Sequence, residues 1–209
     1  MENYSLTDFV STIYILTETN TDGVMLNRLR RSLESSPVVR MGDYDYFISP
    51  ITDGIPYMDP RVLKEVIDAI IEIGEFDCDL ITTPEAMGIP IAVGLSQRLG
   101  IPYNVIRKKK YGLRDEVSVI QCTGYATREL YINGIKKGDR IVLVDDVIST
   151  GGTLSAILKA LKSLRAIIKD VIIVIEKGNV KSRIEKELGV KIKTLVRVEV
   201  RDGQVVVLT

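Results

Sequence analysis

The sequence predicts an α/β fold, a mostly parallel twisted sheet flanked by helices. Short runs rich in Ile, Leu and Val alternate with helical patterns along most of the 209 residues. Continuous apolar runs fit strands that are covered on both faces, and the alternation of strands with helices is typical of parallel sheets. Ligands of such sheets bind beyond the carboxyl ends of the strands, so functional residues are expected there.

Each predicted strand is a short apolar run, and each predicted helix occupies the segment between two runs. The predicted strands are residues 79–82, 103–106, 141–145, 171–175 and 192–198. The predicted helices are residues 61–73, 89–99, 154–165 and 181–188. Residues 36–60 contain four prolines, which indicates a looped or short-stranded connector.

The first part of the chain has a different pattern. Two helical segments are expected around residues 7–16 and 24–35, and turn-forming residues separate them at Asn20–Gly23. We therefore expect residues 1–35 to form a helical appendage that packs on the main domain or on a second subunit. Residues 36–209 are expected to form the main domain.

Composition excludes several classes of function. The 28 basic and 28 acidic residues balance, which argues against a protein dedicated to nucleic acid. No apolar stretch approaches the roughly 20 residues needed to span a bilayer, and no signal peptide is visible, so neither membrane nor secretion is expected. Cys78 and Cys122 lie far apart in the sequence, which suggests a reducing cytoplasm rather than a disulfide framework or a zinc site. Without a single histidine, Ser–His–Asp catalysis and histidine-ligated metals are excluded.

The strongest motif runs from Asp139 to Leu154, where a buried strand ends in the adjacent carboxylates Asp145 and Asp146. A loop of small and hydroxyl residues follows, and then a helix begins. Backbone N–H groups at a helix N-terminus suit a phosphate, whereas carboxylates suit the two neighbouring hydroxyls of a ribose. The motif therefore predicts a site for a ribose 5-phosphate. An isolated acidic pair or an isolated Gly-Gly would more simply be a strand end or a turn.

This segment resembles the phosphoribosyl pyrophosphate (PRPP) signature of the type I phosphoribosyltransferases, which have a Rossmann-like sheet. The resemblance implies that Asp145 and Asp146 hold the ribose hydroxyls. It also implies that Mg²⁺ is the cofactor, bound mainly through PRPP and water without direct protein ligands. The residues expected to cradle the 5-phosphate are Ser149, Thr150, Gly151, Gly152 and Thr153.

Two further segments resemble the elements that bind pyrophosphate in this family. The first lies between a strand and a helix, where adenine-specific members carry an arginine that this chain lacks. The second is a basic run after strand 103–106, in which Arg107 and Lys108 match the family's Arg-Lys pair and are expected to stabilise the leaving group. A plain turn and a solvated basic run are the alternatives. The other expected pyrophosphate ligands are Glu85, Ala86, Met87, Gly88 and Lys110.

The base is expected to lie between a hood and a lid. Residues 45–56 occupy the place of the hood, where Phe47 either stacks on the base or belongs to the core. Residues 111–130 resemble the mobile lid loop, and its Tyr125 matches a tyrosine of adenine-type enzymes. Glu176, after strand 171–175, is the other residue expected near the base.

The resemblance, which covers residues 36–200, implies a purine phosphoribosyltransferase of nucleotide salvage. Ser149 and the Thr-Gly-Gly-Thr ending favour adenine, giving AMP and pyrophosphate, whereas the loop at 85–90 favours hypoxanthine, guanine or xanthine. A PRPP-sensing regulator without catalysis, and a pyrimidine or amino-sugar enzyme, remain as alternatives. The resemblance further implies a homodimer.

Overall fold

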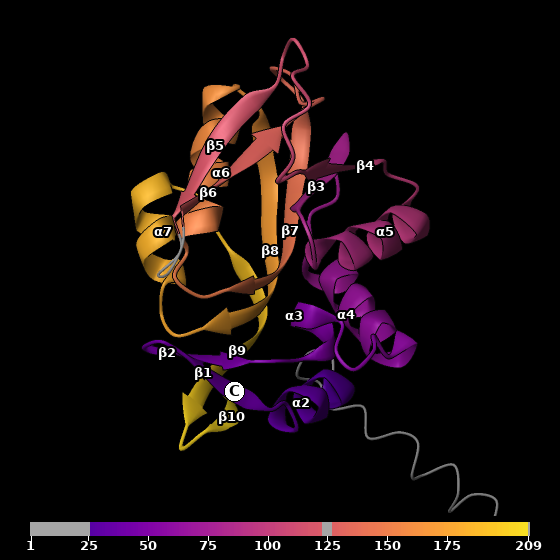
Figure 1. Cartoon of the computed structure of the whole chain (residues 1–209). Coiled ribbons are helices and arrows are strands. Elements are labelled where there is room, and N and C mark those ends of the chain that lie inside the picture. Colours follow the sequence, from indigo (N-terminus) through magenta and orange to yellow (C-terminus); the bar gives the residue numbers. More distant parts are fainter. Residues whose placement is uncertain (1–25, 123–126, 209) are drawn as a thin grey trace, which may run out of the picture.

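The protein is described by a computed structural model for residues 26–122 and 127–208. Its centre is a six-stranded sheet with the order β10-β9-β8-β7-β3-β4 (Figure 1). Strands β4, β3, β7, β8 and β9 run parallel, and β10 is antiparallel to β9. The strands are β3 (Leu80–Pro84), β4 (Tyr103–Ile106), β7 (Arg140–Ile148), β8 (Ile167–Lys177), β9 (Lys193–Arg201) and β10 (Gln204–Leu208). The predicted α/β fold is confirmed.

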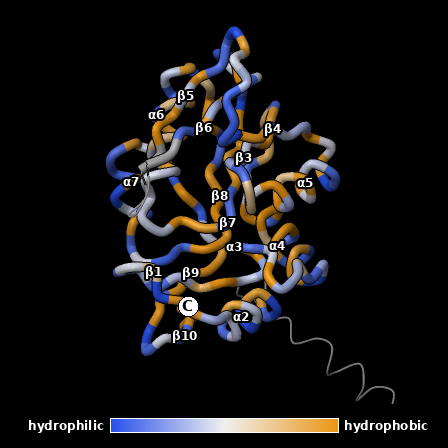
Figure 2. The backbone as a smooth tube through the Cα atoms, in the orientation of Figure 1, coloured by the Kyte–Doolittle hydropathy of each residue, from blue (hydrophilic) through white to orange (hydrophobic). Residues whose placement is uncertain are grey.

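Helices cover both faces of this sheet and enclose two apolar cores. Alternate residues of β7 point to opposite faces, so Val142 joins the core under α4 and α5, and Leu143 joins the core under α6 and α7. Hydrophobic residues follow the strands and the inward faces of the helices (Figure 2). The helices are α2 (Asn27–Glu34), α3 (Pro50–Asp53), α4 (Pro60–Ile73), α5 (Gly88–Leu99), α6 (Gly152–Ser163) and α7 (Lys181–Leu188).

Every strand and helix predicted in residues 61–198 overlaps an observed element, but two features were missed. The segment 111–130, predicted as a loop, contains most of a hairpin of β5 (Val117–Cys122) and β6 (Thr127–Ile132). The exposure of neighbouring side chains alternates there as in a half-buried strand: Val119 is 5% exposed and Ile120 is 61% exposed. Strand β10 was the other omission. The connector at residues 36–60, predicted as looped or short-stranded, contains the hairpin β1 (Val38–Met41) and β2 (Tyr44–Phe47) and also helix α3, which was not predicted.

Helix α2 corresponds to the helix predicted around residues 24–35, and it packs on the main domain. Its Leu29 and Leu33 are fully buried in the core that also contains α4 and α5. The carboxylate of Glu65 on α4 accepts hydrogen bonds from the backbone N–H groups of Arg28 and Leu29, which satisfies donors that the first turn of a helix leaves free. The helix predicted at residues 7–16 lies outside the described residues.

Within the described part of the chain, the helices are all too short or too polar to traverse a bilayer.

Candidate active site

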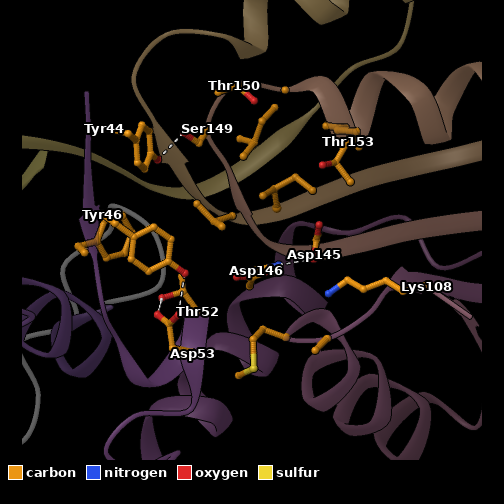
Figure 3. A pocket seen from close by; sticks show the side chains of 18 residues that line it. Tyr44, Tyr46, Thr52, Asp53, Lys108, Asp145, Asp146, Ser149, Thr150 and Thr153 are labelled. Carbon is orange, nitrogen blue, oxygen red and sulfur yellow. Dashed lines mark hydrogen bonds between the residues drawn. The ribbon is translucent and has the colours of Figure 1, made fainter. Parts of the chain in front are cut away.

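A cavity of about 490 Å³ lies at the carboxyl ends of the parallel strands, between the main sheet and the β1–β2 hairpin (Figure 3). This is the edge at which the sequence predicted ligand binding. Five segments far apart in the sequence meet there: β2 with α3, the loop after β3, the basic run after β4, the end of β7 with its following loop, and β8. The residues that line it are Tyr44, Tyr46, Phe47, Thr52, Asp53, Ala86, Met87, Lys108, Asp145–Gly151, Thr153, Leu154 and Ile173.

The two carboxylates at the end of β7 lie in the floor of the cavity. Asp146 is only 9% exposed, and its backbone N–H donates to Asp145 Oδ1 at 3.0 Å. Burial raises the pKa of Asp145 to about 6, and the nearby charge of Lys108 opposes that shift. Burial, followed by the repulsion from Asp145, raises the pKa of Asp146 well above its usual value. In the described structure burial therefore favours the protonated form of both carboxyl groups.

The loop after β7 presents backbone and hydroxyl groups to the same cavity. Ser149, Thr150, Gly151 and Thr153 all line it, whereas Gly152, the first residue of α6, does not. Gly151 has a φ of +76°, a left-handed conformation that strongly favours glycine. These residues lie at the N-terminus of α6, where N–H groups and the helix dipole would suit an anion, and their binding of the 5-phosphate stays a prediction.

The loop between β3 and α5 approaches Asp145 closely. The peptide bond between Glu85 and Ala86 is cis, and Ala86 and Met87 line the cavity. Gly88 begins α5, and a Cβ atom there would lie 1.9 Å from Thr83 Oγ1 and 3.0 Å from Asp145 Oδ1. Only glycine allows the start of α5 to come this near to the Thr83 side chain at the end of β3.

Of the basic run after β4, Lys108 enters the cavity and extends toward Asp145 (Figure 3). Arg107 lies beside the cavity without lining it, and its Nε is 2.8 Å from Glu85 Oε2. The contact is an ion pair without a hydrogen bond, because neither buried atom has a partner of suitable geometry. Lys110 is exposed outside the cavity. Two backbone hydrogen bonds, of 3.0 and 2.7 Å, join Arg107 to Tyr131 of the β5–β6 hairpin.

The roof of the cavity comes from β2 and α3 and contains residues that the sequence reasoning missed. The Tyr44 hydroxyl lies 2.6 Å from Ser149 Oγ, and the Tyr46 hydroxyl donates to Asp53 Oδ1 at 2.7 Å (Figure 3). Tyr44 and Tyr46 share one face of β2, and this alternation is the signal that could have identified them. Phe47 belongs to the core, as one of the two interpretations expected, and it also lines the cavity; its stacking on a base stays a prediction.

The end of β8 places a cation behind this roof. Lys177 Nζ lies 3.7 Å from the centroid of the Tyr44 ring and donates to the backbone carbonyl of Asp45. Its neighbour Glu176 is 5% exposed and does not line the cavity, and one of its carboxylate oxygens is 3.8 Å from Lys181 Nζ. Tyr125, the other residue predicted near the base, lies outside the described residues.

Residues 58–200 match the phosphoribosyl transferase domain. The chain belongs to this phosphoribosyltransferase family. A curated relative from Methanothermus fervidus, hypoxanthine/guanine phosphoribosyltransferase, is 51% identical over 185 residues, 88% of this chain and 98% of the relative. The protein of the same name from Methanocaldococcus jannaschii is 51% identical over 181 residues, 86% of this chain and 99% of the relative.

Solved phosphoribosyltransferase structures share the fold. Adenine phosphoribosyltransferase from Thermoanaerobacter pseudethanolicus superposes with a TM-score of 0.67 at 26% identity, covering 81% of this chain and 98% of that one. The Saccharomyces cerevisiae adenine phosphoribosyltransferase gives a TM-score of 0.66 at 22% identity, covering 81% and 97%, and shows the fold alone. The α/β sheet with its flanking helices is therefore that of the type I phosphoribosyltransferases.

Proposed function

We propose that this protein is a hypoxanthine/guanine phosphoribosyltransferase, which transfers the phosphoribosyl group of PRPP to a 6-oxopurine and releases pyrophosphate. The observation that carries the proposal is the 51% identity to the curated enzymes of that name over 88% of the chain. The loop at residues 85–90 pointed to this alternative, and the relatives support it better than the adenine assignment based on Ser149.

The charges near the cavity also support a 6-oxopurine. The ammonium of Lys177 lies directly behind the Tyr44 ring, and the hydroxyls of Tyr44 and Ser149 flank the cavity. An ammonium donates hydrogen bonds and accepts none, so the positive potential at this wall favours the carbonyl O6 of hypoxanthine or guanine. The 6-amino group of adenine would instead place its own donors toward a cation.

Three groups of lining residues would each bind a different part of PRPP. Asp145 and Asp146 would accept hydrogen bonds from the ribose hydroxyls, and the loop from Ser149 to Thr153 would bind the 5-phosphate. Lys108 would lie beside the pyrophosphate, together with Ala86 and Met87. With PRPP held in this way, the base would lie next to the anomeric carbon, ready to displace pyrophosphate. This positioning of the two reactants would be the main way in which the site accelerates the reaction.

The residues fit the magnesium ion that this family implies. In the described parts of the chain, no group of three or more acidic or cysteine side chains could enclose a metal. Mg²⁺ usually keeps several waters and is held by one or two carboxylates together with substrate phosphates. Asp145 and Asp146 are the carboxylates that would hold it here through water. When bound, the ion would neutralise charge on the pyrophosphate.

Turnover with separate bases tests the proposal. Purified protein with PRPP and Mg²⁺ should release pyrophosphate with hypoxanthine and with guanine, and should form little or no AMP from adenine. AMP as the preferred product would show that Ser149 was the correct guide and would refute the base assignment. PRPP binding without turnover on any base would favour the regulator. Sedimentation of the same sample would test the expected homodimer.

A further inference from the structure

Helix α7 supports the phosphate loop from behind through a charged residue that does not line the cavity. Arg183 Nη2 donates a hydrogen bond of 3.1 Å to the backbone carbonyl of Thr150. Thr150 lines the cavity, whereas Arg183 is exposed on the far side of the loop and lines a separate surface depression. The contact joins two segments that lie 33 residues apart in the sequence.

The geometry of the peptide group gives this contact a consequence inside the cavity. In a trans peptide the C=O and the following N–H point in opposite directions. The cis peptides of the described chain lie at 55–56 and 85–86, so the peptide between Thr150 and Gly151 is trans. With the carbonyl of this peptide pointing at the Arg183 guanidinium, the Gly151 N–H points to the opposite side, away from the guanidinium.

An apolar contact from the same helix holds the next residue in place. A Cβ atom at Gly151 would lie 2.5 Å from Ile184 Cδ1 and 3.0 Å from Val180 Cγ2. Ile184 is 1% exposed and Val180 is 9% exposed, so both form a firm wall behind the loop. Adjacent residues of α7, Arg183 and Ile184, therefore fix the orientation of one peptide group and the position of the α carbon beside it.

We propose that Arg183 is a positioning residue for the 5-phosphate. It does not touch the ligand; it holds the Thr150–Gly151 peptide so that the Gly151 N–H faces the phosphate. The guanidinium also polarises that peptide, which strengthens the N–H as a donor to an anion. This inference rests on the proposed function, because it assumes that the loop binds the phosphate of PRPP.

Two ligands that each contain half of PRPP can separate this role from a general effect of charge. Ribose 5-phosphate occupies the loop, and pyrophosphate occupies the opposite side of the cavity near Lys108. The Arg183→Gln protein removes the guanidinium, and Lys186→Gln makes the same charge change at an exposed position of the same helix. Calorimetric titration of each protein with each ligand gives four dissociation constants to compare with the wild type.

The expected result is selective. Because a single hydrogen bond contributes about 0.5–1.5 kcal/mol, Arg183→Gln should weaken ribose 5-phosphate binding about three- to tenfold, with less than about a twofold change for pyrophosphate. Lys186→Gln should change neither by more than about twofold. In turnover, the KM for PRPP should rise for Arg183→Gln while kcat changes little. Arg183→Lys, which retains a donor and the charge, should recover part of the loss.

Each other outcome contradicts the proposal in a recognisable way. Equal losses in both glutamine variants would show that only the net charge of α7 matters. Equal losses for both ligands, or a large fall in the melting temperature, would show a structural role; Arg183→Lys then repeats the comparison in a folded protein. If Arg183→Gln leaves ribose 5-phosphate binding unchanged, the role of Arg183 is overturned and the proposed function is not affected. Failure of the wild type to bind either ligand would overturn the proposed function together with it.

Discussion

The buried acidic pair should make the unliganded protein less stable than it would be without it. Burial raises the pKa of Asp145 from 3.8 to about 6, so the folded protein holds this proton more tightly than the unfolded chain does. The stability that this protonated carboxyl group contributes to the fold is therefore fully present below about pH 4, and this contribution is lost as the pH rises through about 6. Asp145→Asn removes the charge and keeps the shape, and should stabilise the protein above that range.

The size of the effect follows from the shift in the pKa. A difference of about two pKa units corresponds to about 3 kcal/mol at pH 7.5 and about half of that at pH 5. In a protein of this size, 1 kcal/mol changes the melting temperature by about 2–4 °C, so Asp145→Asn should melt about 6–12 °C higher at pH 7.5. The same substitution should nearly abolish turnover, because the ribose loses a charged acceptor.

Thermal unfolding of both proteins from pH 5 to pH 8 measures this difference directly. Asp43→Asn is the matched control, since it removes a fully exposed carboxylate and should leave the melting temperature within about 2 °C of the wild type. The reasoning is refuted if Asp145→Asn is no more stable than the wild type at pH 7.5. It is also refuted if the gain is the same at pH 5 and pH 8.

Two other substitutions test the loops around the cavity. Gly151→Ala should reduce PRPP binding at least tenfold and lower the melting temperature, because the new methyl group would overlap Ile184 and the φ of +76° disfavours alanine; near-normal PRPP binding would contradict the close contact. Glu85→Gln should tighten inhibition by pyrophosphate about three- to tenfold, because Arg107 no longer shares its charge with a carboxylate. Weaker inhibition would instead show that Glu85 holds Arg107 in its binding position.

Features that are continuous in the sequence could be predicted, and contacts between distant segments could not. The strand that ends at Asp145 and the loop that follows were recognisable because one stretch of chain contains the carboxylates, the glycines and the start of α6. The hydroxyl contact between Tyr44 and Ser149 joins residues 105 positions apart, and no periodicity reveals such a pair. The position of Lys177 behind Tyr44 likewise depends on how the β1–β2 hairpin folds over the sheet.

The lid segment shows a different limit. Residues 117–122 form a strand, but the consecutive apolar residues Val119 and Ile120 interrupt the alternation that would have indicated it, and the resemblance to a mobile loop led to the opposite prediction. For the basic run, sequence alone could not distinguish which cation enters the cavity. The ion pair with Glu85 holds Arg107 beside the cavity, and Lys108, one residue further on, extends into it.

The connection between β8 and α7 joins two sides of the cavity. Strand β8 ends at Lys177, behind the aromatic wall of the cavity, and α7 begins at Lys181, two residues before the arginine that holds the phosphate loop. A rearrangement at one end of this short connection is therefore transmitted directly to the other. Inserting or deleting a residue in 178–180 should shift Lys177 relative to Arg183, and so change the distance between the wall proposed to face the base and the loop proposed to bind the phosphate.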